Sequence, residues 1–213
     1  MMDPITSSLP DDLLRRAGGL FADGSRRLLG ITGEPGSGKS TLAARLSAAL
    51  GPERAVVVPM DGYHLAQGEL DRLGRADRKG APDTFDAAGF VSLLRRLRHP
   101  ADGETVYAPC FRREIEEPVA GCIAVSSATP LVIVEGNYLL LDGPWSAVRQ
   151  LLDESWFVAT PEPDRQAWLL ARHMAFGRSR TEAVAWIAHT DEPNAVLIRA
   201  SRVHADLLVT GTG

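Results

Sequence analysis

Short apolar runs recur along the chain, and each has the length and composition of a buried β-strand. Five runs show this pattern: Leu28–Thr32, Ala55–Pro59, Leu131–Glu135, Ser155–Ala159 and Asp206–Thr210. Elsewhere, apolar residues return every three or four positions, which is the spacing of an amphipathic helix. The segments with this spacing are Asp11–Ala22, Thr41–Leu50, Asp86–His99, Pro161–Phe176 and Thr181–Ala188. Strands that alternate with helices predict an α/β fold, with a five-stranded parallel sheet and helices on both faces.

The alternation is interrupted between the second and third strands. Tyr63–Thr84 is polar and rich in Gly, Asp and Arg, and we interpret it as a loop with short helical pieces. Thr105–Phe111 and Val119–Val125 are extended segments on either side of a charged tip, so they predict an antiparallel β-hairpin. We expect this hairpin to cover the substrate as a flap.

Composition limits the classes of protein to consider. A chain of 213 residues that is 45% hydrophobic can bury one core, so residues 1–213 are expected to form a single domain. The net charge of -4 gives no basic surface for a nucleic acid. No apolar run has the length of a membrane span, and the amino terminus does not resemble a signal peptide, so we expect a cytoplasmic protein. Its two cysteines, Cys110 and Cys122, are expected to be reduced.

A glycine-rich loop follows the first strand. Residues 33–40 read Gly-Glu-Pro-Gly-Ser-Gly-Lys-Ser, which fits the phosphate-binding pattern G-x-x-x-x-G-K-[ST]. Its backbone N–H groups would surround phosphate oxygens at the positive end of the following helix. Lys39 would bind the β- and γ-phosphates, and the Ser40 hydroxyl would ligate Mg²⁺. The predicted nucleotide-binding residues are Gly33, Glu34, Pro35, Gly36, Ser37, Gly38, Lys39, Ser40 and Thr41.

Two carboxylates lie at strand ends that would meet the phosphate loop at one edge of the sheet. Asp61 follows the second strand, where it could orient a substrate hydroxyl and accept its proton, or could simply cap the next turn. Glu135 ends the third strand, where it could hold Mg²⁺ and lie against the substrate, or could make a structural hydrogen bond. A carboxylate at the end of a buried strand needs a cation or donors, which favours the metal role for Glu135.

Arginines on and after Pro161–Phe176 are candidates for a mobile lid. Thr160 is a suitable cap for this helix, and Arg165 and Arg172 share one of its faces. Such arginines could close over a triphosphate and stabilise charge during transfer, with Arg172 and Arg178 as the favoured pair. A solvated basic face is the alternative.

Further substrate contacts are expected from two segments. Tyr63 and His64 follow Asp61 closely, although a histidine in a loop is often only a surface residue. Arg112 and Arg113 lie at the tip of the predicted hairpin, where they could bind an anionic group of the substrate or merely solvate the turn beside three glutamates.

Several short sequence motifs follow one another along the chain. They are the loop at 33–40, Met-Asp-Gly-Tyr-His at 60–64, Arg-Lys-Gly-Ala-Pro-Asp-Thr-Phe-Asp at 78–86, Val-Glu-Gly-Asn-Tyr-Leu-Leu at 134–140, Ala-Arg-His at 171–173, Gly-Arg at 177–178 and Ala-Asp-Leu-Leu at 205–208. In this order they resemble the phosphoribulokinase, uridine kinase and bacterial pantothenate kinase superfamily. More narrowly, the chain is similar to bacterial proteins of the nucleoside/nucleotide kinase family or fructose transport system kinases.

The resemblance implies the P-loop nucleoside triphosphate hydrolase fold, ATP and Mg²⁺ as cofactors, and transfer of a phosphoryl group to a hydroxyl of a small metabolite. The implied roles are catalytic base for Asp61, magnesium binding for Glu135 and Ser40, phosphate binding for Lys39, and lid arginines for Arg172 and Arg178.

The acceptor stays open among sugars, nucleosides and pantothenate-like molecules. The flap departs from the uridine kinase pattern, because Phe111 stands where those enzymes have tyrosine and Arg112 where they have aspartate. A uridine kinase and a nucleotide-dependent regulator are the alternatives, although the Asn-Lys-x-Asp string of a GTPase does not occur. The oligomeric state is also open, with a homodimer as one arrangement.

Overall fold

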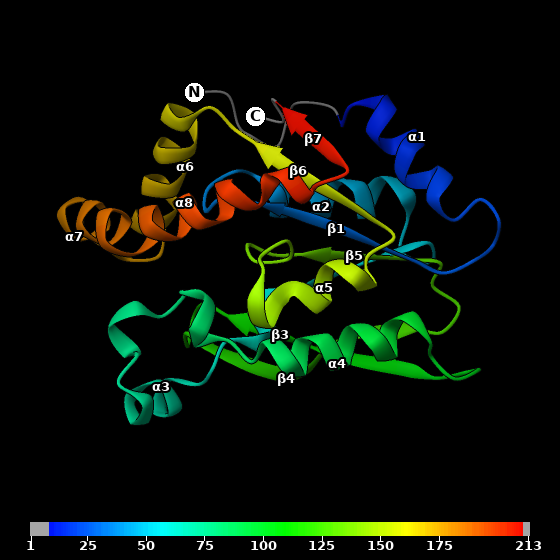
Figure 1. The fold of residues 1–213 in the computed structure, drawn as a ribbon, viewed down its shortest axis with the longest axis horizontal. Helices are drawn as coiled ribbons and strands as arrows, with labels where there is room; N and C mark the ends of the chain where they lie inside the picture. Colours follow the sequence, from blue (N-terminus) through cyan, green and yellow to red (C-terminus); the bar gives the residue numbers. More distant parts are fainter. Residues whose placement is uncertain (1–8, 211–213) are drawn as a thin grey trace.

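The computed structural model describes residues 9–210, which are built around a five-stranded sheet in the order β2-β5-β1-β6-β7 (Figure 1). The strands are β1 (Arg27–Gly33), β2 (Ala55–Pro59), β5 (Leu131–Glu135), β6 (Glu154–Ala159) and β7 (Leu207–Thr210). All neighbouring pairs are parallel. The predicted α/β fold and its five strands are confirmed, with single-residue shifts at some strand ends.

Helices cover both faces of this sheet, because successive side chains of a strand point to opposite sides. Leu29 is buried together with residues of α1 (Asp11–Leu20) and α2 (Lys39–Leu50). Leu28 is buried with the other core, which includes residues of α4 (Ala87–Arg98) and α5 (Ser146–Leu151). None of the helices within residues 9–210 has the length and apolar character needed to cross a membrane.

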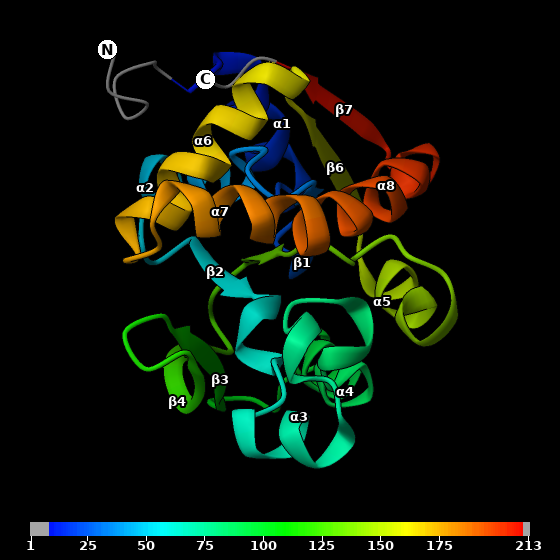
Figure 2. The ribbon, with the colours of Figure 1, turned by 90° about the vertical axis from the view of Figure 1, so that its left-hand side faces the viewer.

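Three helices follow β6 and lie at the edge where the strands end (Figure 2). They are α6 (Glu162–Ala175), α7 (Arg180–Trp186) and α8 (Glu192–Ser201). A π-helical turn over Ile187–Asp191 joins α7 directly to α8. The predicted helix Thr181–Ala188 corresponds to α7 and the start of this turn, whereas the sequence pattern did not identify α8.

The predicted flap is an antiparallel hairpin of β3 (Thr105–Arg112) and β4 (Glu117–Ser126). It packs against the short turn Met60–Tyr63 that follows β2. Gly62 permits this contact, because a Cβ there would lie 2.4 Å from the carbonyl oxygen of Pro109. The polar segment after the turn contains α3 (Gln67–Leu73) and two 3₁₀ turns, as predicted.

The prediction of reduced cysteines is wrong for this structure. Cys110 and Cys122 form a disulfide across the hairpin, with their Cα atoms 5.6 Å apart. The pairing of the two strands shifts register between Ala108 and Cys110, and this irregularity brings Cys110 opposite the 119–122 segment. A separation of 12 residues in the sequence did not reveal which residues of the hairpin would face each other.

Candidate active site

The glycine-rich loop connects β1 to α2 through a tight turn. Gly36 and Gly38 have φ values of 82° and 86°, which residues with side chains rarely adopt. Gly36 also lies against α6, since a Cβ there would be 2.7 Å from the carbonyl oxygen of Arg165. The loop thus ends at the first turn of α2, an arrangement in which loop N–H groups and a helix N-terminus together bind phosphate.

The first two residues of α2 converge on Glu135 at the end of β5. The Ser40 hydroxyl donates a hydrogen bond of 3.0 Å to Glu135 Oε1, and Lys39 Nζ lies 4.0 Å from the same oxygen. Burial lowers the pKa of the Lys39 ammonium group and raises the pKa of the Glu135 carboxyl group, while the charge of each residue opposes the shift of the other. A bound phosphate beside Lys39 and a cation beside Glu135 would favour both ionised forms.

This cluster fits Mg²⁺ that is shared with a bound phosphate. Ser40 and Glu135 supply neighbouring oxygen donors, but the described part of the chain contains no group of three or more His, Cys, Asp or Glu residues that could hold a metal by itself. Mg²⁺ commonly takes one or two protein oxygens and completes its shell with water and phosphate oxygens. The donor set therefore suits a nucleotide-bound magnesium ion.

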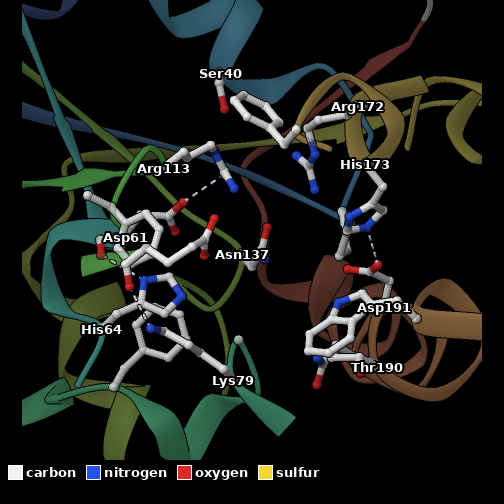
Figure 3. A pocket seen from close by; sticks show the side chains of 18 of the residues that line it. Ser40, Asp61, His64, Lys79, Arg113, Asn137, Arg172, His173, Thr190 and Asp191 are labelled. Atoms are coloured by element: carbon white, nitrogen blue, oxygen red, sulfur yellow. Dashed lines mark hydrogen bonds and ion pairs between the residues drawn. The ribbon is translucent and has the colours of Figure 1, made fainter. Parts of the chain in front are cut away.

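Asp61 lies beyond the end of β2, next to Glu135. Pro59 of β2 pairs with Glu135, which pairs in turn with Ile31 of β1, so the three strand ends lie side by side. The Asp61 side chain is 33% exposed and forms an ion pair of 3.6 Å with Arg113 (Figure 3). Its backbone oxygen, rather than its carboxylate, closes the following turn by accepting hydrogen bonds from the backbone N–H and Nδ1 of His64. The carboxylate thus remains accessible to a ligand.

His64 and Tyr63 point in different directions. The His64 ring packs between Phe85 and Phe111, with centroid distances of 4.0 and 4.5 Å, and it lines the cavity beside Asp61. The Tyr63 ring packs against Phe90 at 5.4 Å and is not among the residues that line the cavity. Burial lowers the pKa of His64, so its imidazole is neutral near pH 7.

We expect the burial of His64 to make the protein less stable as the pH falls below about 6.5. The unfolded chain then binds a proton at this residue before the folded protein does, so the free energy of unfolding decreases. The loss is about 1.4 kcal/mol for each pH unit between the two pKa values. Thermal unfolding between pH 7.5 and 5.5 should show a smaller loss of stability for His64→Asn than for the wild type. The exposed His204 gives the control, because His204→Asn should retain the wild-type loss; equal losses in all three proteins would contradict the prediction.

The lid helices form the opposite wall of the cavity. Arg172 and His173 project from the end of α6, and His173 Nε2 lies 2.8 Å from the Asp191 carboxylate in the π-helical turn (Figure 3). Burial lowers the pKa of Arg172 and the charge of Arg113 adds to this shift, while Asp191 and other carboxylates oppose it. The sequence did not indicate the His173–Asp191 pair, since these residues come from different elements.

Arg178 also lines the cavity, and its position is fixed by an aromatic ring. Its guanidinium group lies 3.9 Å from the ring centroid of Trp186 on α7. Stacking of this kind holds the charge without using its hydrogen-bond donors, so these remain available to phosphate oxygens.

Arg165, a weaker lid candidate, lies elsewhere and is 1% exposed. Its guanidinium group pairs with Glu34 at 3.2 Å and Glu192 at 2.6 Å, and it donates a hydrogen bond to the carbonyl oxygen of Pro35. Arg199 of α8 adds two hydrogen bonds of 2.8 Å to the Glu34 carboxylate. The first part of α6 packs on the phosphate loop and only its end reaches the cavity, which separates Arg165 from Arg172 although they share a helix face.

The start of α6 also differs from its prediction. Thr160 does not cap the helix; its hydroxyl donates a hydrogen bond of 2.7 Å to the carbonyl oxygen of Ser37, and Pro161 takes the capping position. Thr160 therefore stabilises the phosphate loop instead of capping α6.

A cavity of about 410 Å³ lies between the two walls. The predicted site residues that line it are Pro35, Lys39, Ser40, Asp61, His64, Glu135, Arg172 and Arg178. The predicted residues outside its lining are Gly33, Glu34, Gly36, Ser37, Gly38, Thr41, Tyr63 and Arg112. Arg113, the first residue of the hairpin turn, lines the cavity, whereas Arg112, the last residue of β3, does not.

Comparison with known proteins agrees with this geometry. The model of the phosphoribulokinase/uridine kinase family matches residues 28–210. The chain belongs to this family. A Schizosaccharomyces pombe protein named "Putative uridine kinase" is 36% identical to it over 210 residues, which are 93% of this chain and 89% of that protein. An Aspergillus versicolor protein named as ATP-dependent kinase-like is 39% identical over 161 residues, which are 71% of this chain and 94% of that protein.

A solved structure extends the similarity to three dimensions. The crystal structure described as a "putative fructose transport system kinase" from Silicibacter sp. TM1040 has a TM-score of 0.83 and 38% sequence identity, and the match covers 92% of this chain and 98% of that one. This member of the phosphoribulokinase/uridine kinase family is thus a P-loop kinase, which is a phosphotransferase acting on small molecules.

Proposed function

We propose that this kinase transfers the γ-phosphoryl group of MgATP to a hydroxyl group of a small metabolite, with Asp61 as the base. One observation carries the proposal: Asp61 lines the same cavity as Lys39, Ser40 and Glu135. These residues lie at or just after the ends of neighbouring strands. Phosphoryl transfer requires positioning and charge neutralisation more than covalent chemistry from the protein. The phosphate-binding loop with Lys39 would neutralise phosphate charge, and the accessible carboxylate opposite the loop would position the acceptor hydroxyl.

Each residue has a distinct part in this proposal. The loop N–H groups and Lys39 would bind the phosphates, and Ser40 and Glu135 would hold Mg²⁺, which would neutralise phosphate charge. Arg172 and Arg178 stabilise the negative charge that spreads over the transferring group. Asp61 orients the acceptor hydroxyl and takes its proton.

The acceptor remains a sugar, a nucleoside or a pantothenate-like molecule in this proposal. A uridine kinase is the second candidate, supported by the name of the Schizosaccharomyces pombe relative. Against this candidate, the chain departs from the uridine kinase pattern at Phe111, which lines the cavity, and at Arg112, which ends β3.

Release of ADP by the purified protein tests the proposal. With MgATP and a panel of sugars, nucleosides and hydroxy acids, we expect at least one acceptor to raise ADP release by about tenfold or more, and excess EDTA to abolish it. The phosphorylated acceptor should be detected by mass spectrometry. ADP release that is the same with and without every acceptor would instead support a nucleotide-dependent regulator.

A further inference from the structure

A lysine on the acceptor side of the cavity is held by neutral oxygens. Lys79 Nζ donates hydrogen bonds to the backbone oxygen of Glu116 at 2.6 Å and to Gln67 Oε1 at 3.3 Å, and it lies 5.7 Å from the centroid of the Phe111 ring. Among the described residues, no carboxylate lies within ion-pair distance of this ammonium group. It lines the cavity on the same side as Asp61 and His64 (Figure 3).

Neighbouring cations of the same segment are arranged differently. Arg72 is paired with Glu69 at 2.6 Å, and Arg78 is paired with Asp83 at 2.8 Å, both on the surface. Lys79 therefore differs from both arginines: it lines the cavity, and it has no carboxylate partner among residues 9–210.

The loop that carries Lys79 is fixed by hydrogen bonds. The hydroxyl of the buried Tyr138 donates to the backbone oxygen of Gly80, whose N–H donates to the hydroxyl of Thr84 at 2.9 Å. The same Thr84 hydroxyl donates to the backbone oxygen of Ala81. A charge on a fixed loop loses little conformational entropy when it binds a ligand.

Arg113 provides a second cation on this wall. It lies 3.6 Å from Asp61, and its guanidinium group is 6.0 Å from the centroid of the Phe111 ring. Lys79 and Arg113 thus flank Phe111, while the adjacent His64 is neutral because burial lowers its pKa. The carboxylates on this wall are Asp61, which the reaction requires, and Glu116, whose backbone oxygen binds Lys79.

We propose that the acceptor is a small anionic alcohol whose carboxylate or phosphate group is bound by Lys79, with Arg113 beside it. This inference rests on the proposed kinase function and names its substrate class. The third N–H of Lys79 would donate to the anion while the acceptor hydroxyl lies at Asp61. Neutral sugars and nucleosides would leave the charge of Lys79 with its two neutral oxygen partners and no anion, so we expect the site to favour anionic acceptors over them.

The experiment compares acceptors that differ in charge. The carboxylate arm pairs glycerate with glycerol and pantothenate with pantothenol, the phosphate arm pairs fructose 6-phosphate with fructose, and uridine represents neutral nucleosides. We expect the anionic member of a pair to be phosphorylated with the higher kcat/KM. If the preferred anion belongs to the carboxylate arm, the substrate is a carboxylate; if it belongs to the phosphate arm, the substrate is a phosphate ester.

Lys79→Met tests whether this residue binds the anion. We expect the KM for the anionic acceptor to rise by about 10- to 100-fold, equivalent to about 1.4–2.8 kcal/mol, with kcat and the KM for MgATP nearly unchanged. Lys79→Arg should recover part of the affinity. Arg78→Met is the matched control, because Arg78 is paired with Asp83 on the surface and its loss should not change acceptor KM.

Several results would overturn this inference while leaving the kinase function intact. One is faster phosphorylation of the neutral member in every pair, and another is an unchanged preference for anions in a folded Lys79→Met protein. If no compound of the panel is phosphorylated, calorimetry measures whether the same compounds bind in the presence of Mg²⁺ and a non-hydrolysable ATP analogue. Binding of an anion that Lys79→Met weakens supports the inference, and failure of every anion to bind overturns it.

Discussion

Asp61→Asn should lower acceptor-dependent turnover by about 10²- to 10⁴-fold while the protein still binds MgATP. The substitution keeps the size of the side chain but removes the group that accepts the hydroxyl proton. Asp61 lies in the turn after β2, whereas the phosphate loop follows β1, so we expect the loop to keep its conformation and bind nucleotide without this carboxylate. Steady-state ADP release with the best acceptor, together with calorimetric titration of an ATP analogue, measures both effects.

Asp83→Asn is the control for this variant. Asp83 is a carboxylate of the same part of the chain, but it pairs with Arg78 on the surface and does not line the cavity. We expect it to retain acceptor-dependent turnover. An Asp61→Asn protein that phosphorylates the acceptor at the wild-type rate would contradict the role of Asp61 as the base.

Gly36→Ala should weaken nucleotide binding by at least about tenfold, which is about 1.4 kcal/mol. A Cβ at this position would lie 2.7 Å from the backbone oxygen of Arg165, and φ is 82°, so the loop must move away from α6. Movement of the loop would misplace the N–H groups that bind phosphate. Titration with MgATP or a non-hydrolysable analogue measures the loss of affinity.

Gly51→Ala separates the effect of backbone conformation from that of the contact. Gly51 has a φ of 93°, but a Cβ there would meet no atom within 4 Å. Both variants should lose about 1 kcal/mol or more of stability, because alanine disfavours positive φ. Only Gly36→Ala should lose nucleotide affinity, and an equal loss in Gly51→Ala would show that the contact with α6 is unimportant.

The sheet and the phosphate loop could be predicted because their evidence is local. Apolar runs such as Leu131–Glu135 indicate buried strands directly, and the parallel arrangement then brings Asp61 and Glu135 to one edge. The hairpin was equally clear from two extended segments around a charged tip. These features depend on residue types within a few positions of each other.

The remaining features depend on which elements meet in space. Arg165 and Arg172 have the same position on a helix face, but one is enclosed by Glu34 and Glu192 and the other reaches the cavity. The choice between Arg112 and Arg113 depends on the local direction of the chain at the hairpin tip, and the disulfide depends on an irregular register. The spacing of residues along the sequence does not indicate these contacts.

The acceptor wall comes from one uninterrupted stretch of chain. His64, Lys79, Phe111 and Arg113 all lie between β2 and β5, which are neighbours in the sheet, whereas the phosphate loop and the lid lie outside this stretch. An exchange of residues 63–126 with a relative would therefore replace the acceptor-binding surface as a single module. Asp61, the proposed base, and the phosphate-binding loop would stay in place, so we expect such an exchange to change the substrate preference without changing the chemistry.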